Sequence, residues 1–229
     1  MLCVLPKYRG QGIGTELLFV SEEYIRSQGY TEVQFCDGVD YITPGIPMYE
    51  GNVEFFEKHG YQHSWGTTEC VDMNLSLSDF DPGEYRIGDT IRNIQYRWAV
   101  PEDLDRIIDC VDDAWSEFTQ YYRNETLYDG KHSQSVLIAL CDNIVCGTLI
   151  VSNQTEAKGL GSVGCTTTRH DYQRRGIATT MVKLGTRYLY EIGLPTAYLG
   201  YTYTEIIPMY ARSGYQVCMK YFMGKKQLL

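Results

Sequence analysis

The apolar residues between positions 13 and 25 recur at the spacing of one face of an α-helix. They stand at i, i+4, i+7, i+11 and i+12, which fits the helical period of ~3.6 residues. These positions are Ile13, Leu17, Val20, Tyr24 and Ile25. Gly29 follows them and suits the left-handed residue beyond a helix C-terminus. The pattern predicts an amphipathic helix that begins directly after the glycine-rich run YRGQGIG at 8–14.

The same pattern returns 164 positions later, since Tyr8 aligns with Tyr172 and Gly12 with Gly176. The second run is YQRRGIA, and a second apolar stripe follows it. Its positions are Ile177, Met181, Leu184, Tyr188 and Leu189. This helix also ends at a glycine, Gly193. Agreement over such a length predicts an internal repeat.

Each predicted helix is followed by the same order of elements. A short strand comes next, at 32–38 in the first copy and at 196–202 in the second. A helix that ends in Gly-Tyr follows, at 53–61 and 206–215. The two copies therefore agree beyond the glycine-rich run.

Further elements are predicted before the second copy of the run only. They are a linker at 78–90, a strand at 91–100, a helix that opens at Pro101, a hairpin at 133–153 that turns at Asp142-Asn143, and a strand at 159–168. The predicted domains are thus 1–77, which begins at the fourth strand of its copy, and 91–229, joined by 78–90. Only some fourteen residues follow Gly214-Tyr215, so the second copy is expected to lack or borrow its last strand.

Composition narrows the classes of function. A hydrophobic fraction of 44% without any apolar run of membrane length or secretory leader predicts a globular, cytoplasmic protein with no membrane association. The net charge of −9 argues against nucleic acid, which needs a basic footprint, and is compatible with a cationic acceptor. Eight cysteines without a C-x-x-C pair, and histidines without ligand spacing, predict free, buried thiols and no metal site.

The glycine-rich runs resemble the acyl-CoA signature of the GNAT acyltransferase superfamily, [Q/R]-x-x-G-x-[G/A]. The first copy reads Arg9-x-x-Gly12-x-Gly14 and the second reads Gln173-x-x-Gly176-x-Ala178. IQYRWAVPEDLDRI (94–107) is also similar to the first strand and helix of that family. The resemblance covers 1–77 and about 91–223. It implies an α/β fold of two GNAT-like units, each a mixed, mostly antiparallel sheet flanked by helices, with the first unit lacking its first three strands.

Small residues let a backbone approach a ligand closely, and the free N–H groups of a helix N-terminus suit a pyrophosphate. The resemblance therefore implies acetyl-CoA as cosubstrate. The implied residues of the second copy are Cys165, Thr166, Thr167 and Thr168 beside the pantetheine arm, and Gln173, Arg174, Arg175, Gly176, Ile177, Ala178 and Thr179 around the diphosphate. Those of the first copy are Arg9, Gly10, Gln11, Gly12, Ile13 and Gly14, although whether this copy binds coenzyme A stays open. A bulge in the strand at 165–168 is expected to splay it from its neighbour. A Rossmann site is rejected, since neither run has G-x-G-x-x-G spacing.

The family's catalytic acid is often a tyrosine four residues before the closing glycine, and Tyr210 holds that position before Gly214. Phe56 holds it in the first copy and cannot donate a proton. The general base is not identified, because Glu117 and Glu205 are candidates that can equally be surface carboxylates. Four tyrosines either line the acceptor cleft or pack in the ordinary way: Tyr121, Tyr122, Tyr201 and Tyr203.

The resemblance implies transfer of an acetyl group from acetyl-CoA to a primary amine of a small molecule or peptide. A non-catalytic acyl-CoA-binding sensor or scaffold is the alternative. Since Met1 to Pro6 are all that precedes the first run, its strand edge is expected to be covered. The cover would come from the C-terminal domain, from a second chain in a homodimer, or from a missing N-terminal segment.

Overall fold

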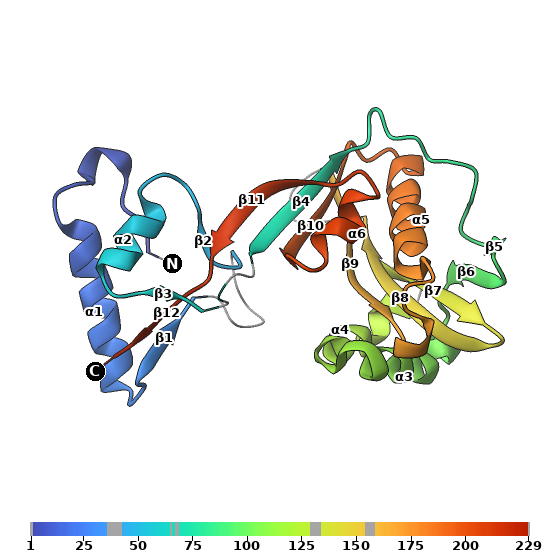
Figure 1. Ribbon diagram of the computed structural model, residues 1–229, viewed down its shortest axis with the longest axis horizontal. Helices are drawn as coiled ribbons and strands as arrows, with labels where there is room; N and C mark the ends of the chain where they lie inside the picture. Colours follow the sequence, from blue (N-terminus) through green and yellow to red (C-terminus); the bar gives the residue numbers. More distant parts are fainter. Residues whose placement is uncertain are drawn as a thin grey trace. The chain divides into compact units, whose positions relative to one another are not determined.

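The computed structural model describes residues 2–35, 43–64, 66, 69–128, 134–153 and 159–228. The chain forms two compact units (Figure 1). The first unit combines Met1–Cys70 with Met219–Leu229, and the second comprises Val71–Cys218. None of the described helices is long and apolar enough to cross a membrane.

The first unit is a small sheet with two helices. Its elements are α1 (Ile13–Ser27), β1 (Glu32–Gln34), β2 (Ile46–Pro47), α2 (Asn52–Lys58), β3 (Gln62–His63) and β12 (Gly224–Gln227). The sheet has the order β1-β12-β3, and both pairings are antiparallel. Strand β2 pairs with Tyr221 and Phe222, at the end of β11.

The second unit is built on a larger, mostly antiparallel sheet. Its strands are β4 (Cys70–Ser76), β5 (Thr90–Ile91), β6 (Ile94–Trp98), β7 (Gln134–Cys141), β8 (Ile144–Ser152), β9 (Leu160–Thr168), β10 (Thr196–Tyr203) and β11 (Gln216–Phe222). Its helices are α3 (Leu104–Trp115), α4 (Thr119–Tyr122), α5 (Ile177–Glu191) and α6 (Ile207–Ala211). The strands lie in the order β11-β4-β10-β9-β8-β7-β6-β5.

The internal repeat is confirmed at the helix that follows each glycine-rich run. Helix α1 begins at Ile13 and ends at Ser27, and α5 begins and ends 164 positions later, at Ile177 and Glu191. Both helices follow a left-handed glycine, and left-handed Gly29 and Gly193 lie beyond their C-termini. The two copies of the sequence therefore fold alike at this level.

The last strands of the two copies are exchanged. Strand β12, at the end of the second copy, lies between β1 and β3 in the first unit, while β4, from the first copy, lies between β11 and β10 in the second (Figure 1). Only Met223 separates β11 from β12, whereas a tight hairpin needs at least two residues in its loop, so the chain cannot fold back and runs on. The second copy thus borrows its last strand, as expected, and the compact units divide the chain differently from the ranges 1–77 and 91–229.

Two predicted segments differ in the structure, and a third is described only in part. The strand expected at 91–100 is a hairpin of β5 and β6, because Arg92 and Asn93 are both left-handed and reverse the chain. Residues Leu2–Leu5 align with the end of β9 but form no strand, since none of the described strands pairs with them. The end of the strand expected at 32–38 lies outside the described residues.

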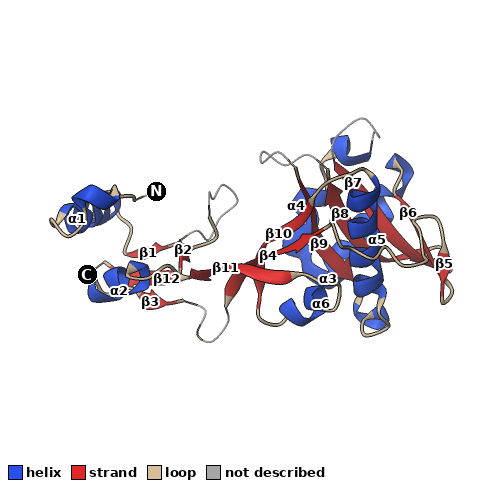
Figure 2. Ribbon diagram, turned by 90° about the horizontal axis from the view of Figure 1, so that it is seen from above, coloured by secondary structure: helices blue, strands red, loops and turns tan. Residues whose placement is uncertain are grey.

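The hairpin expected at 133–153 is confirmed, with its turn at left-handed Asp142 and Asn143 between β7 and β8. Alternate residues of β7 reach opposite faces of the sheet. Leu137 and Ala139 belong to the core cluster that contains α5, and Val136 and Ile138 to the cluster that contains α3. Helices α5 and α3 thus cover opposite faces (Figure 2).

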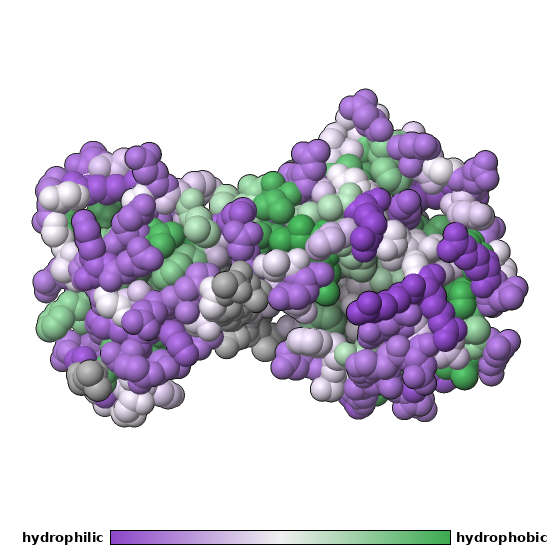
Figure 3. Space-filling view, viewed as in Figure 1, coloured by the Kyte–Doolittle hydropathy of each residue, from purple (hydrophilic) through white to green (hydrophobic). Residues whose placement is uncertain are grey.

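Figure 3 shows the surface of one face of the molecule. Hydrophilic residues (purple) cover most of the face drawn in Figure 3, with apolar residues (green) between them. Of the described cysteines, all are free thiols. Cys70, Cys110 and Cys146 are buried, but Cys3 and Cys218 are exposed, so the expectation of buried thiols holds only in part.

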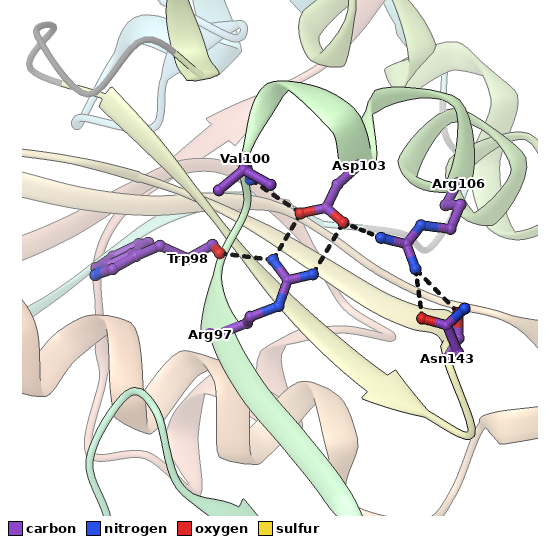
Figure 4. Close-up of polar contacts among 6 residues, drawn as sticks. All are labelled: Arg97, Trp98, Val100, Asp103, Arg106 and Asn143. Atoms are coloured by element: carbon purple, nitrogen blue, oxygen red, sulfur yellow. Dashed lines mark hydrogen bonds and ion pairs between the residues drawn. The ribbon is translucent and has the colours of Figure 1, made fainter.

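A buried carboxylate joins β6 to the start of α3 (Figure 4). Asp103 accepts hydrogen bonds of 2.6 and 2.9 Å from the Arg97 guanidinium and one of 2.9 Å from the Val100 N–H, and it also pairs with Arg106. Arg106 in turn donates to the Asn143 side chain at 2.8 Å, in the β7–β8 turn. Burial alone would raise the pKa of Asp103, but these hydrogen bonds and charges outweigh it and lower that pKa.

Candidate active site

Two side chains fix the turn before α5 by hydrogen bonds to backbone carbonyls. Gln173 Nε2 donates to the Thr168 carbonyl at 3.1 Å, and the Arg175 guanidinium donates to the Asp171 carbonyl at 2.6 Å. Gly176 is left-handed, with φ of 82°, and a Cβ added there would meet no atom within 4 Å. Helix α5 begins at the next residue, so its first N–H groups have no partner within the helix. The turn has the form of an anion site at a helix N-terminus.

The first copy reproduces this geometry. Arg9 Nε donates to the Val4 carbonyl at 3.1 Å, and Gln11 Nε2 to the Lys7 carbonyl at 3.4 Å. These are the positions of Gln173 and Arg175 shifted by 164. Gly12 has φ of 83° and likewise faces open space. The backbone of the predicted turn Arg9–Gly14 is therefore equivalent to that of Gln173–Ala178.

Strand β9 carries the expected bulge. Its pairing with β8 shifts register between Thr148 and Ile150, and Cys165 opposite them is left-handed with φ of 48°. Strand β10 pairs in parallel with β9 only over Leu160–Ser162, so the two strands splay beyond that point. The Tyr122 hydroxyl donates to the Cys165 carbonyl and fixes the bulge. One edge of the Cys165–Thr168 backbone is thereby left open to a ligand.

A cavity of about 970 Å³ lies where these features meet. Its walls come from the end of α3, the bulged strand, the turn before α5, and the region of α6. The lining residues are Ala114, Trp115, Phe118, Thr166, Thr167, Thr168, Tyr172, Gln173, Arg174, Gly176, Ile177, Ala178, Thr179, Tyr203, Glu205, Ile206, Met209 and Arg212. We call it the donor cavity. It brings together most of the residues predicted around Gly176, while Cys165 and Arg175 are not among its lining.

One hydroxyl of a residue that lines the donor cavity has no partner in the described part of the chain. The Thr168 hydroxyl oxygen is buried without a hydrogen bond, although Thr168 lines the cavity. A buried hydroxyl without a partner is unfavourable, and a bound molecule with amide groups would supply one. The residues present therefore fit coenzyme A, with an anion site at one end and an open strand edge with a vacant hydroxyl beside it.

The predicted acid, Tyr210, lies behind the cavity wall. Its side chain is buried, and its hydroxyl is 3.0 Å from the hydroxyl of Thr166, a residue that lines the cavity. Burial raises the pKa of Tyr210 to about 12, against the smaller opposing effect of the bond to Thr166. The phenol is thus protonated at neutral pH. Phe56, its counterpart, packs in the apolar cluster of the first unit.

Some of the other predicted side chains line the donor cavity and others do not. Tyr203 and Glu205 line the donor cavity, while Glu117 accepts a hydrogen bond of 3.3 Å from the Trp115 indole. Burial raises the pKa of Tyr203, and the charges of Glu205 and Glu117 act in the same direction. Tyr122 is fully buried, in accord with the packing alternative.

Sequence reasoning missed several residues of the cavity wall, among them Trp115, Met209 and Arg212. Trp115 continues the apolar spacing of Ile107, Ile108 and Val111 but is 46% exposed at the end of α3. Arg212 lies two residues after Tyr210, inside the motif Y-A-R-S-G. A cation next to the predicted acid was the available signal.

Two family models match the chain. The family model described as "Acetyltransferase (GNAT) family" matches residues 97–215, and "Acetyltransferase (GNAT) domain" matches residues 1–63. No curated protein matches the chain.

Similar solved structures share the fold at low identity. A GNAT protein from Sphaerobacter thermophilus is 20% identical with a TM-score of 0.70, over 98% of this chain and 71% of its own. A tandem GNAT protein of the clavulanic acid pathway is 17% identical with a TM-score of 0.70, over 99% and 73%. The glucosamine N-acetyltransferase region of a fungal multi-domain β-N-acetylglucosaminidase is 19% identical with a TM-score of 0.75. That alignment includes 98% of this chain but only 29% of the fungal protein.

The second family model covers more than half of the chain and spans the splayed strands, the glycine turn and the helix of Tyr210. The chain therefore belongs to the GNAT acetyltransferase family, as an acyltransferase with two GNAT domains in tandem.

Proposed function

We propose that the second unit transfers an acetyl group from acetyl-CoA to a primary amine of a small molecule or peptide. The observation that carries this proposal is the donor cavity, where the anion site before α5 and the open edge of β9 meet in one space. When bound, acetyl-CoA supplies the activated acetyl group. The acetyl C–S bond breaks and an amide C–N bond forms, while the amine loses a proton and the coenzyme A thiolate takes one up.

The chain's own residues provide the binding and the proton. The free N–H groups at the start of α5, with Gln173–Thr179, hold the diphosphate, and Cys165–Thr168 hold the pantetheine arm along β9. Tyr210 holds the proton, as any phenol does at neutral pH, and the Thr166 hydroxyl, 3.0 Å away, relays it towards the cavity. The backbone geometry of the first turn, Arg9–Gly14, supports a second acyl-CoA site there. The free thiols support a reducing compartment, the cytoplasm, as the place of action.

Release of free coenzyme A thiol from acetyl-CoA, measured against a panel of amines, tests the proposal. Tyr210→Phe should lower kcat by about a hundredfold, with the KM for acetyl-CoA unchanged. Thr166→Val should do the same, since it breaks the relay. Tyr215→Phe is a matched control, because Tyr215 is also buried with a raised pKa but bonds to Thr186 on α5. An unchanged kcat in Tyr210→Phe would remove its assigned role.

A second candidate, an acyl-CoA-binding module without turnover, is favoured by one observation. Tyr210 is not itself part of the cavity wall, so proton delivery depends on the Thr166 hydroxyl. Acetyl-CoA binding without thiol release in the presence of any amine would favour this module.

A further inference from the structure

A second cavity, of about 310 Å³, lies beside the bulge of β9. It is lined by Gln120, Tyr121, Asn124, Ile150, Ser152, Ser162, Gly164 and Cys165. On β9 its lining ends at Cys165, and that of the donor cavity begins at Thr166. Consecutive residues of the bulge thus reach the two cavities. A molecule in the second cavity lies next to the strand segment assigned to the pantetheine arm.

Gly164 opens the floor of this cavity. A Cβ built on it would meet no atom within 4 Å, and its φ lies outside the left-handed region. Gly147 and Gly161 on the same sheet differ, since a Cβ there would come within 3 Å of neighbouring side chains. The space above Gly164 is therefore available to a ligand, and a larger side chain would fill it without distorting the strand.

The lining has a definite chemical character. Two carboxamide residues, a tyrosine and two serines line this small space together with Ile150, Gly164 and Cys165, and no residue of the described lining is charged. Amide and hydroxyl groups can both donate and accept hydrogen bonds, as can the hydroxyls of a ligand. A second charge on the ligand would find no opposite charge here. The donor cavity differs, since Arg174, Arg212 and Glu205 line it.

We propose that this second cavity holds the body of the acceptor, and that the acceptor is a primary amine on a small, uncharged, polyhydroxylated body. The proposal rests on acetyl transfer in the second unit and specifies its substrate class. The volume agrees with a small ligand, because ~300 Å³ is near the lower limit of ligand pockets in proteins. The amine nitrogen then reaches the bulge from the side of Cys165, and acetyl-CoA reaches it from the side of Thr166.

Three amines of equal carbon number test the acceptor class. Glucamine carries hydroxyls along its chain, hexylamine carries none, and hexamethylenediamine carries a second ammonium. At saturating acetyl-CoA, and with concentrations expressed as the neutral amine, kcat/KM for glucamine should exceed both others by about tenfold or more. Hexylamine or the diamine performing equally well would overturn the proposal. Absence of thiol release with every amine would instead count against acetyl transfer itself.

Gly164→Leu tests the location, with Gly164→Ala as the matched control. The leucine should raise the KM for glucamine by about tenfold or more, whereas alanine should change it little and neither should change acetyl-CoA affinity. Gln120→Met, on the exposed rim, should raise the KM for glucamine but not for hexylamine. It is the second test if the leucine variant does not fold. Unchanged glucamine kinetics in the variants would overturn the assignment.

Direct binding separates this proposal from the proposed function. Saturation-transfer NMR should detect glucamine on the wild-type protein and not on Gly164→Leu. Such binding without turnover would leave the cavity assignment standing while acetyl transfer fails. Glucamine turnover that neither Gly164→Leu nor Gln120→Met changes would leave acetyl transfer standing and overturn the cavity assignment.

Discussion

Helices α1 and α5 follow equivalent turns, have equivalent bounds and carry equivalent apolar stripes, but their surroundings differ. Ile13 is 40% exposed and its counterpart Ile177 is 2% exposed. Leu17 is 42% exposed, whereas Met181 is fully buried. The stripe of α5 packs in the core cluster with residues of β7, β8 and β9. The described residues of the first unit include no counterparts of these strands.

The difference shows which features are local and which need the sheet. Side-chain bonds and one left-handed glycine form the turn in both copies, so a few residues suffice for it. Burial of the helix stripe, and a cavity between splayed strands, require strands that the second unit has and the described part of the first unit lacks. The signature is thus a property of the segment, while the active site is a property of the domain.

The largest expected effect is on stability at the paired positions Met181 and Leu17. Met181→Ala should lower the free energy of unfolding by about 2–5 kcal/mol, because it leaves a cavity in the core. Leu17→Ala should cost less than about 1 kcal/mol, because its side chain is already partly in water. Urea denaturation of both variants measures the difference.

The comparison fails if the two substitutions cost the same. A large loss in Leu17→Ala would mean that α1 is covered in solution, by a second chain or by another segment. Size-exclusion chromatography with light scattering, run on the same samples, would then identify a homodimer.

The next largest effect concerns the two glycines at the turns. Gly176→Val should weaken acetyl-CoA binding by about a hundredfold, since a β-branched residue at φ of 82° distorts the anion site. Gly12→Val introduces the same strain at φ of 83° but is expected to leave turnover unchanged. Isothermal titration with acetyl-CoA, together with the thiol-release assay, checks both. Equal loss of turnover would place catalysis in both units.

Much of the architecture follows from patterns within short segments. The stripe from Ile13 predicts α1, Asp142-Asn143 predict the β7–β8 turn, and repetition at 164 predicts the second copy. These features depend on neighbours along the chain. The bulge at Cys165 came instead from the family resemblance, since no local signal requires a left-handed cysteine.

Local sequence patterns could not predict the contacts between segments that are far apart in the sequence. The Thr166–Tyr210 contact spans two elements far apart in sequence, and only the fold brings Trp115 to the same wall as Arg212. Exchange of β4 and β12 depends on which sheet each strand completes. The short link at Met223 is a sequence signal for it, but only after the ends of β11 and β12 are known.

A smaller effect is expected where the exchanged strands meet the helices. In the first unit the Leu228 N–H donates to the Thr31 carbonyl, and in the second the Leu77 N–H donates to the equivalent Pro195 carbonyl. Two residues before these leucines, Lys226 and Leu75 therefore hold equivalent positions. Lys226 lies against Gly60, and Leu75 lies against the equivalent glycine, Gly214. Lys226 Nζ pairs with buried Glu22 at 2.7 Å, and Tyr61 also donates to Glu22.

Lys226→Met should therefore lower the free energy of unfolding by about 1–3 kcal/mol, because it leaves a buried carboxylate without its cation. The lysine is partly exposed, so the loss should stay below that of a fully buried pair. Leu75→Met is the control, with an expected cost below about 1.5 kcal/mol. Denaturant titration measures both, and an unaltered midpoint in Lys226→Met would show that the pair does not hold β12 in place.

The smallest effect belongs to the part of the second unit that has no counterpart in the first, the joint of β6 and α3 at Asp103. Its folded pKa is lowered, so its ionised form stabilises the fold above the unfolded pKa of ~3.9. That contribution is lost as the pH falls through the folded pKa. Urea denaturation of wild type and Asp103→Asn between about pH 7 and pH 3 should therefore show a stability difference that shrinks below about pH 4. A difference that stays constant over this range would mean that Asp103 acts through shape and neutral hydrogen bonds rather than through its charge.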